Sequence, residues 1–257
     1  MSRVTARNSV CRLCRQPGQL CKSHILPEFV YREVYDERHT FAEFSGTPNE
    51  RNRRRRKGIW ERILCTACER RFQSHEDYAC NLIFNNPSVS FPRPEGGMVF
   101  HDIDYPKLKL FQLSLLWRAG VSSQSMFRHV KLGPYEEQLR EHLLCSGSVP
   151  PGDFPCTMEA IVDRGSHLKG LMMEAVPMKT DRDRSTVYPF VFGGYRWGFL
   201  VRAGLREPPP EISLTETRLR IGQIDVSKIP GLFDLFARAH KQGKFRDFER
   251  AARTNAT

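Results

Sequence analysis

The chain has 257 residues, of which 40% are hydrophobic, and lysine plus arginine outnumber aspartate plus glutamate by 40 to 29. This hydrophobic content excludes a wholly disordered chain, and the longest apolar stretch, residues 108–121, contains charged side chains and is shorter than the roughly 20 residues of a membrane span. The net charge of +11 favours an anionic partner, with nucleic acid as the first candidate and a membrane surface as the second.

The N-terminal end has no apolar run of signal-peptide length before Cys11. We therefore expect a cytoplasmic protein with no membrane partner, whose eight cysteines are reduced thiols rather than disulfides. Paired cysteines in such a protein indicate a metal site. The first pair, Cys11 and Cys14, has the Cys-x2-Cys spacing that places two sulfurs on one tight turn.

Three secondary-structure elements are predicted in the first segment of the chain. A short helix should follow Pro27, because proline is well tolerated at a first helical position, and a short strand should cover residues 60–64. A longer helix should begin near Thr66 and run toward Leu82, where apolar residues recur at helical spacing. Prolines and glycines follow, so residues 1–86 are interpreted as one metal-held module.

Six cations lie between the predicted short helix and the predicted strand. They are Arg51, Arg53, Arg54, Arg55, Arg56 and Lys57. Cations packed this closely repel one another and are not buried, so we predict an exposed arginine-rich loop over residues 51–57 that contacts phosphates. The alternative is a solvated loop without a partner.

A second Cys-x2-Cys pair, Cys65 and Cys68, lies at the start of the predicted long helix. Two such pairs supply the four thiolates of a closed tetrahedral zinc site. Thiolate binding contributes about 10 kcal/mol or more in small zinc domains. A structural Zn2+ bound by Cys11, Cys14, Cys65 and Cys68 would therefore organise a segment that has few core residues of its own.

A different grouping of ligands is also consistent with the spacing, because Cys21 and His24 stand at the same interval as each cysteine pair. Two local sites would then form, the first from Cys11, Cys14, Cys21 and His24 and the second from Cys65, Cys68, His75 and Cys80. In that arrangement His24 is a structural ligand. The number of zinc ions per chain distinguishes the two arrangements.

Residues 98–257 are predicted to form an α+β region in which helices are followed by an antiparallel sheet. Helices are expected over residues 108–120 and 134–144, and a closing helix after residue 231. Strands are expected over residues 157–162, 170–176, 187–192, 195–201 and 219–224. Gly193-Gly194 is a two-residue hairpin signal. Three roles are consistent with this region: it could select the substrate, bind a protein partner or inhibit the N-terminal module.

The N-terminal segment resembles the zinc-stabilised branch of the HNH endonucleases over about residues 10–84. The resemblance rests on the first cysteine pair, on the His-Ile-Leu-Pro sequence that begins at His24, and on a strand that leads into Cys65 and Cys68 at a helix start. It implies a ββα-metal treble clef in which the histidine before Ile-x-Pro activates water for attack on a phosphodiester bond. By position, that histidine is His24.

The resemblance also implies a catalytic Mg2+ or Mn2+ ion near His24. The family usually has Asp or His before this histidine and His or Asn after the last cysteine, whereas this chain has Ser23 and Glu69. A carboxylate suits a hard divalent ion, and Glu76 lies two helical turns beyond Glu69 on the same face. The predicted catalytic set is therefore His24, Glu69 and Glu76. The alternative is that both acids lie on the surface and balance neighbouring arginines.

One further position departs from the family. Residues 60–64 contain no asparagine, although the family places there an asparagine that orients the histidine. With His24 as general base, the resemblance implies a metal-dependent endonuclease that acts on DNA more readily than on RNA, and an arginine loop that binds backbone phosphates without reading sequence. The competing hypothesis is a zinc-held module that has lost catalysis and binds nucleic acid or protein.

Overall fold

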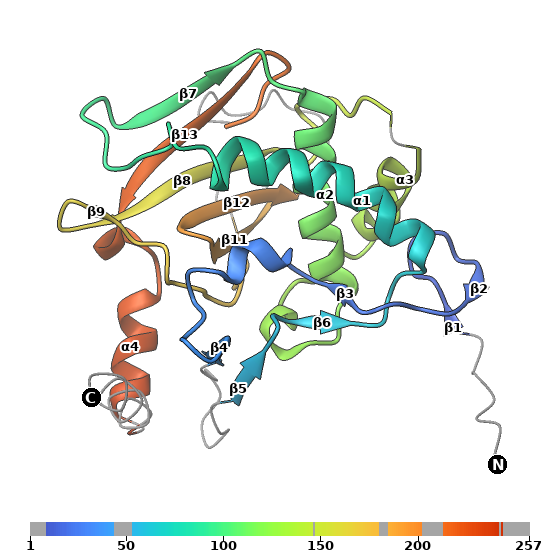
Figure 1. Ribbon diagram of the computed structural model, residues 1–257, viewed down its shortest axis with the longest axis horizontal. Coiled ribbons are helices and arrows are strands. Elements are labelled where there is room, and N and C mark those ends of the chain that lie inside the picture. The colour runs from blue at the N-terminus through green and yellow to red at the C-terminus, as the bar shows by residue number, and fades with distance from the viewer. Residues whose placement is uncertain are drawn as a thin grey trace.

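The computed structural model describes residues 9–43, 53–145, 147–179, 185–201, 213–241 and 243. Its centre is a seven-stranded mixed sheet with the strand order β10-β11-β12-β8-β13-β7, and β9 pairs with β8 outside this path (Figure 1). The strands are β7 Gly97–His101, β8 Cys156–Asp163, β9 Ser166–His167, β10 Met178–Lys179, β11 Thr186–Phe192, β12 Tyr195–Val201 and β13 Arg218–Asp225.

Three helices pack beside one another and against this sheet. They are α1 Thr66–Ala79, α2 Tyr105–Val121 and α3 Tyr135–Cys145. Asp104 caps the N-terminus of helix α2, because its carboxylate accepts a hydrogen bond from the backbone N–H of Lys107. Nearly all residues of α2 are buried. Its Phe111 ring meets Trp197 of β12 at 6.2 Å between centroids, so α2 joins the sheet to the rest of the core. The closing helix, α4 Leu232–Lys241, follows β13.

The N-terminal part consists of three short ribbons and α1. The ribbons pair β1 Ser9–Val10 with β2 Pro17–Gly18, β3 Ser23–His24 with β6 Trp60–Glu61, and β4 Thr40–Glu43 with β5 Arg53–Arg56. A single 3-10 turn, Glu28–Tyr31, stands where the short helix is predicted. Helix α1 begins at the predicted residue, Thr66, and is followed by a π-helical turn over Cys80–Phe84.

Several predicted elements are confirmed in the second region. Helices α2 and α3, strands β8, β11, β12 and β13, and helix α4 all lie where the periodicity indicates. The predicted hairpin joins β11 to β12, and both of its glycines have positive φ, 61° at Gly193 and 85° at Gly194. Glycine adopts such angles without the steric penalty that a Cβ atom brings.

The predicted sheet is wrong in three respects. The sheet is mixed rather than antiparallel, because β13 pairs in parallel with β8. Strand β7 falls in a stretch that contains no predicted strand, and it adds an edge to the sheet by pairing with β13. Residues 170–176 are not a strand, and only Met173 makes an isolated bridge, to Val191. All three features depend on pairing between strands that are distant in the sequence, and the local hydrophobic pattern of a segment does not indicate such pairing.

The arginine-rich segment is a strand and not the exposed loop that its charge suggests. β5, Arg53–Arg56, pairs with β4 in an antiparallel ribbon, and Arg51 lies outside the described residues. Side chains alternate between the two faces of a strand, so consecutive arginines point in opposite directions and their charges are kept apart. An extended ribbon therefore accommodates a run of arginines that a compact turn would crowd together.

The two segments predicted from the sequence share one hydrophobic core. Phe72 of α1, Leu108 and Phe111 of α2 and Trp197 of β12 belong to the same cluster of buried residues. Residues before position 86 are therefore packed against residues after position 98. No helix in the described ranges is both long enough and apolar enough to cross a membrane.

Candidate metal centre and active site

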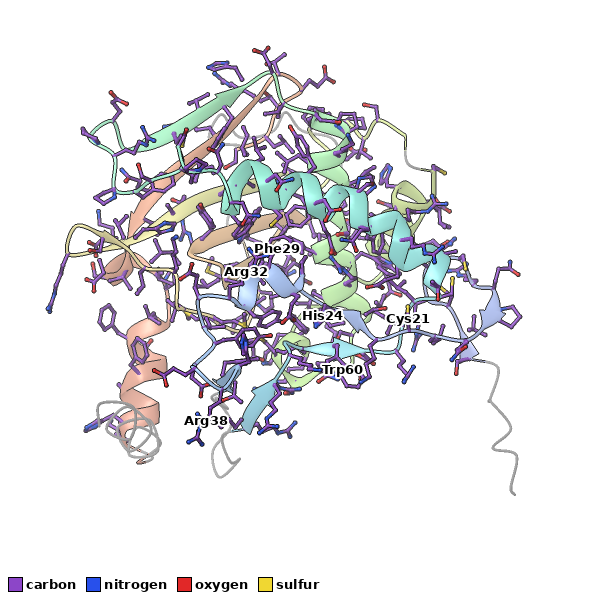
Figure 2. The ribbon with its side chains drawn as sticks, viewed as in Figure 1. Cys21, His24, Phe29, Arg32, Arg38 and Trp60 are labelled. Carbon is purple, nitrogen blue, oxygen red and sulfur yellow. The ribbon has the colours of Figure 1, made fainter. Side chains whose placement is uncertain are left out.

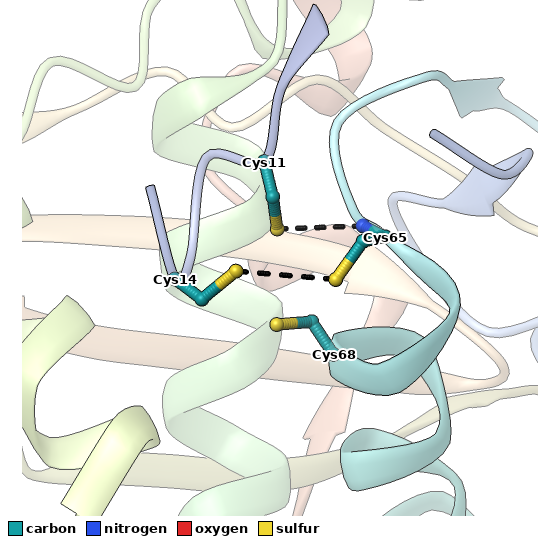
Figure 3. A group of neighbouring side chains, drawn as sticks. All are labelled: Cys11, Cys14, Cys65 and Cys68. Atoms are coloured by element: carbon teal, nitrogen blue, oxygen red, sulfur yellow. Dashed lines mark hydrogen bonds between the residues drawn. The ribbon is translucent and has the colours of Figure 1, made fainter. Parts of the chain in front are cut away.

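The four paired cysteines come together in one cluster, as the sequence predicts. The sulfur atoms of Cys11, Cys14, Cys65 and Cys68 all lie within 4.8 Å of one another (Figure 3). A tetrahedral zinc ion with Zn–S bonds near 2.3 Å needs sulfurs about 3.8 Å apart. The Sγ atoms of Cys14 and Cys65 are 3.9 Å apart, so the donor set fits a metal such as zinc.

Local structure explains how the cysteines reach this arrangement. Cys11 and Cys14 lie in the turn between β1 and β2, while Cys65 caps the N-terminus of α1 and Cys68 lies in its first turn. The backbone N–H of Cys65 donates to Cys11 Sγ at 3.3 Å. The backbone N–H of Cys68 lowers the pKa of the Cys65 thiol to about 7, which favours the thiolate that a metal binds.

The alternative arrangement with two local metal sites is excluded. Of the described residues, only the four paired cysteines form a group with metal-ligand geometry. Cys21 instead donates from Sγ to the Leu64 carbonyl at 3.1 Å, and Cys80 accepts a hydrogen bond from the Asn85 amide. His24 is therefore not a ligand of the cysteine cluster.

Helix α3 supports the first cysteine turn from the second region of the chain. Arg140 donates from Nη1 to the Leu13 carbonyl at 2.8 Å, and Glu137 forms an ion pair with Arg15. Both contacts are made to residues that lie between or beside Cys11 and Cys14. The metal centre is thus held by residues that are more than a hundred positions away in the sequence.

His24 lies on β3, opposite Trp60 of β6, and Figure 2 labels both residues. Its Nε2 atom is 3.0 Å from the Lys57 carbonyl oxygen and 2.9 Å from Oε2 of Glu28. Both neighbours are hydrogen-bond acceptors, so Nε2 carries the proton in the neutral ring and Nδ1 has the lone pair. Among the described residues, none is hydrogen bonded to Nδ1, and the side chain is 29% exposed. The nitrogen that is able to accept a proton thus belongs to a partly exposed side chain and has no hydrogen-bond partner in the described part of the chain.

Glu28 is a site residue that the sequence reasoning missed. It approaches His24 from the 3-10 turn after Pro27, and its other oxygen accepts a hydrogen bond from the Tyr35 hydroxyl at 2.6 Å. Together with the Lys57 carbonyl, Glu28 orients the ring. The resemblance would have assigned that role to an asparagine, which this chain lacks in residues 60–64. The helical i,i+4 rule does not account for this contact, because His24 lies on β3 and only Glu28 lies on the 3-10 turn, so no sequence signal marked it.

Glu69 and Glu76 face the interior, so the alternative of two surface acids is wrong. Burial raises the pKa of Glu69, while the hydroxyl of Ser23 and the charges of Arg118 and His24 act in the opposite direction. Oε2 of Glu69 is buried and has no hydrogen-bond partner in the described part of the chain. Glu69 thus lies in the electrostatic environment of His24 and Glu76, although the three do not form a ligand cluster as close as that of the cysteines.

Arg118 of α2 is the second site residue that sequence reasoning missed. Its side chain is 1% exposed and pairs with Glu76 at 2.7 Å. It also donates to the His24 carbonyl oxygen at 2.8 Å and to the Ser114 hydroxyl. Arg118 therefore connects α2, α1 and β3 at the base of the histidine site. No sequence signal relates it to the site, because it lies in a mostly apolar helix, 94 residues from His24.

Replacing Arg118 with methionine should destabilise the protein by about 3 kcal/mol or more, because Glu76 would keep a mostly buried charge without a partner. Urea unfolding followed by circular dichroism measures this change. Arg128→Met is the matched control, since its pair with Glu174 is partly exposed and should be worth less than about 1 kcal/mol. Equal effects of the two substitutions would contradict a buried role for Arg118.

The arginine ribbon contains side chains with different surroundings. Arg54 donates from Nε to the Thr40 hydroxyl at 2.7 Å and pairs with Asp36. Hydrogen bonds from the Thr40 side chain and from Arg54 hold the pKa of Asp36 well below its usual range. Arg55 and Arg56 line a surface pocket near Trp60. Arg54 thus stabilises the ribbon, while Arg55 and Arg56 border the surface that a ligand can reach.

Comparisons with models of protein families, with curated proteins and with solved structures find no match to this chain.

Proposed function

We propose that this protein is a metal-dependent nuclease of the HNH type, which hydrolyses phosphodiester bonds in DNA or RNA, with DNA as the expected substrate. In this proposal the cysteine cluster holds a structural Zn2+, and the ribbon β3–β6 with α1 corresponds to the ββα-metal treble clef. The observation that carries the proposal is the placement of His24, a partly exposed ring oriented through Nε2, near Glu69, whose Oε2 atom is buried and has no hydrogen-bond partner among the described residues.

His24 would act as the general base. Nδ1 accepts a proton from water as the water attacks phosphorus. The Nε2–H group keeps its hydrogen bonds to the Lys57 carbonyl and the Glu28 carboxylate throughout, so the ring does not rotate away from the water. The negative charge of Glu28 also stabilises the imidazolium that forms, as a carboxylate does in other histidine-based sites. Glu28 is a positioning residue in this scheme and does not touch the substrate.

One buried carboxylate oxygen near His24 is available to a hard divalent ion, although His24, Glu69 and Glu76 are not gathered into a close ligand cluster. The buried Oε2 of Glu69 lacks a hydrogen-bond donor in the described structure, and a carboxylate oxygen is a preferred ligand for Mg2+ or Mn2+. Glu69 would hold the ion, with Glu76 and His24 as its neighbours. Such an ion stabilises negative charge on the leaving oxygen. Burial raises the pKa of Glu69, so ionisation of this carboxyl would be assisted by the bound cation.

The charge of the protein supports a nucleic-acid substrate. The net charge is +11, and the exposed Arg53 and Arg56 extend from the ribbon next to the histidine site. Contacts of this kind would bind backbone phosphates and would weaken as salt concentration rises. Residues 98–257 support the site through Arg118 and Arg140, and they remain candidates for substrate selection or for binding a protein partner.

A second candidate function is a nucleic-acid-binding module without catalytic activity. The observation that favours it is the ion pair between Glu76 and Arg118, which occupies one of the two predicted acidic ligands. In this case the zinc-held module would bind nucleic acid or act as an adaptor. Salt-sensitive binding without cleavage under any divalent metal would support this candidate against the nuclease.

Purified protein should cleave plasmid DNA, and RNA more slowly, in the presence of Mg2+ or Mn2+ and not in EDTA. Glu69→Gln should raise the metal concentration needed for half-maximal cleavage by about tenfold or more, because the substitution removes a charged ligand. Glu136→Gln is the matched control on the exposed side of α3 and should behave like the unmodified protein. Cleavage that is insensitive to EDTA, or an unchanged metal requirement in Glu69→Gln, would overturn the proposed role of the ion.

A further inference from the structure

An open pocket of about 420 Å3 lies on the surface beside the histidine site. The residues that line it include Arg55, Arg56, Gly58, Trp60, Arg62 and Gln124. Its volume falls within the range of roughly 300 to 1,000 Å3 that is typical of small-molecule sites. The pocket combines strand β5, the turn that follows it, strand β6 and the residues after α2, so the folded chain and not a local motif creates it.

The pocket adjoins the proposed general base. Trp60 and His24 are directly opposite each other in the antiparallel pair β3–β6, so their side chains share one face of the ribbon. Gly58 follows Lys57, whose carbonyl oxygen contacts His24 Nε2. A Cβ atom at Gly58 would lie only 3.1 Å from Oε2 of Glu28. His24 and Glu28 are not among the residues that line the pocket, and they adjoin it through Trp60 and Gly58.

The charge of the pocket is positive despite one acidic residue. Glu61 also lines the pocket, but its carboxylate accepts hydrogen bonds from the hydroxyls of Ser122 and Ser123 and from the backbone N–H of Ser123. Arg62 is held in place through a hydrogen bond of 2.7 Å from Nη1 to the Leu20 carbonyl. Among the described residues that line the pocket, the guanidinium groups of Arg56 and Arg62 therefore accompany a single carboxylate, whose oxygens already accept hydrogen bonds. Such a surface attracts an anion, and arginine binds phosphate oxygens especially well.

Trp60 supplies an aromatic surface in the same pocket. It differs from Trp117 and Trp197, which are completely buried in the core, because its side chain is only partly covered. The exposed Lys22 places its ammonium 4.5 Å from the centroid of the Trp60 ring. Lys22 covers one face of the indole, so a base would stack on the opposite face, and the neighbouring cations suit a ligand that has both a flat ring and a negative charge. Nucleotides have both, and bases stack on such side chains in proteins that bind single strands.

We propose that this pocket binds an unpaired nucleotide, with its base against Trp60 and a neighbouring phosphate at Arg56. The inference rests on the proposed function, and it narrows the substrate class to single-stranded nucleic acid or to unpaired positions within a duplex. Both faces of a base are covered by its neighbours in a continuous duplex, so stacking on Trp60 requires the base to leave the helix. The nucleotide would lie one residue away from the phosphodiester bond presented to His24.

The experiment measures binding without cleavage, in EDTA, with the His24→Ala variant. Fluorescein-labelled oligothymidylate and a blunt duplex of the same length are compared by fluorescence anisotropy, and inorganic polyphosphate serves as competitor. The single strand should bind more tightly than the duplex and should quench the fluorescence of Trp60, because the other two tryptophans are buried. Trp60→Leu, introduced into the His24→Ala protein, should weaken single-strand binding by about 5-fold to 100-fold, which is the range of base–aromatic stacking. Trp60→Phe in the same background should retain most of the single-strand affinity.

Phe233→Leu provides the control for loss of an exposed aromatic ring, because Phe233 lies on α4 and does not line the pocket. Its binding should match that of the parent protein. Equal affinity for single strand and duplex, equal weakening by Trp60→Leu and Phe233→Leu, or complete displacement by polyphosphate without any change in quenching would overturn the pocket proposal. A protein that binds single strands through Trp60 but never cleaves would instead refute the nuclease and leave the pocket intact.

Discussion

Replacing His24 with alanine should reduce phosphodiester cleavage by about 10²-fold to 10⁴-fold while the protein stays folded. This range is the usual contribution of a general base, and the scheme assigns proton transfer to this one ring. The side chain of His24 is partly exposed, and its hydrogen-bond partners Glu28 and Lys57 are near the surface, so we expect the fold to tolerate its loss. Initial rates on supercoiled plasmid at saturating Mg2+ measure the effect, and circular dichroism verifies the fold.

His101→Ala is the matched control, because His101 is an exposed histidine on the edge strand β7 and belongs to no part of the site. It should cleave at the rate of the unmodified protein. Glu28→Gln should give an intermediate reduction, since the amide retains a hydrogen-bond acceptor for Nε2 but loses the charge that stabilises the imidazolium. Cleavage at an unchanged rate in His24→Ala would refute the mechanism, and a contaminating nuclease would be recognised by equal activity in every variant.

Loss of the structural metal should unfold the N-terminal part of the protein. Zinc binding by four thiolates contributes about 10 kcal/mol or more, which is comparable with the roughly 5 to 15 kcal/mol that stabilises a whole domain. Cys65→Ser or prolonged treatment with a strong chelator should therefore eliminate cooperative thermal unfolding of this part. Because α1 shares its core with α2 and the sheet, we expect the rest of the chain to lose stability as well.

Native mass spectrometry should find one zinc ion per chain, bound in the unmodified protein and absent from Cys65→Ser. Cys145→Ser is the control, since Cys145 is an exposed thiol at the end of α3 and lies outside the cluster. It should retain the metal and the melting temperature. Two zinc ions per chain, or a chelator-treated protein with unchanged unfolding, would contradict a single structural site formed by the four paired cysteines.

The parts of the site that could be predicted are those with a local signature. The spacing of Cys11, Cys14, Cys65 and Cys68 depends on turn geometry around a tetrahedral ion, so the ligand set was predictable although a long segment separates the pairs. The start of α1 at Thr66 and the hairpin at Gly193-Gly194 follow from hydrophobic periodicity and from the freedom of glycine at positive φ. Such features need no knowledge of the rest of the fold.

The arginine segment shows where local reasoning fails. Its charge correctly indicates exposure, because Arg53, Arg54 and Arg56 lie at the surface. Charge alone does not indicate that β4 provides a partner strand, or that Asp36 fixes one of these side chains. Backbone pairing with β4 and the ion pair between Asp36 and Arg54 hold this segment as a strand. Repulsion between the arginines, considered alone, predicts a loop.

The sequence by itself indicated the two cysteine pairs as metal ligands, His24 as the candidate base and the positive charge of the arginine segment, but it left two groupings of the metal ligands open, and the structure brings together the four paired cysteines. Only the tertiary structure decided what holds His24 in place and what adjoins it. Glu28 and the Lys57 carbonyl orient the ring, Arg118 comes to its base from α2, and the Trp60 pocket is completed by Gln124. The physical reason is that metal-ligand spacing is encoded within a few residues, whereas a buried ion pair or a pocket wall requires packing between distant helices and strands.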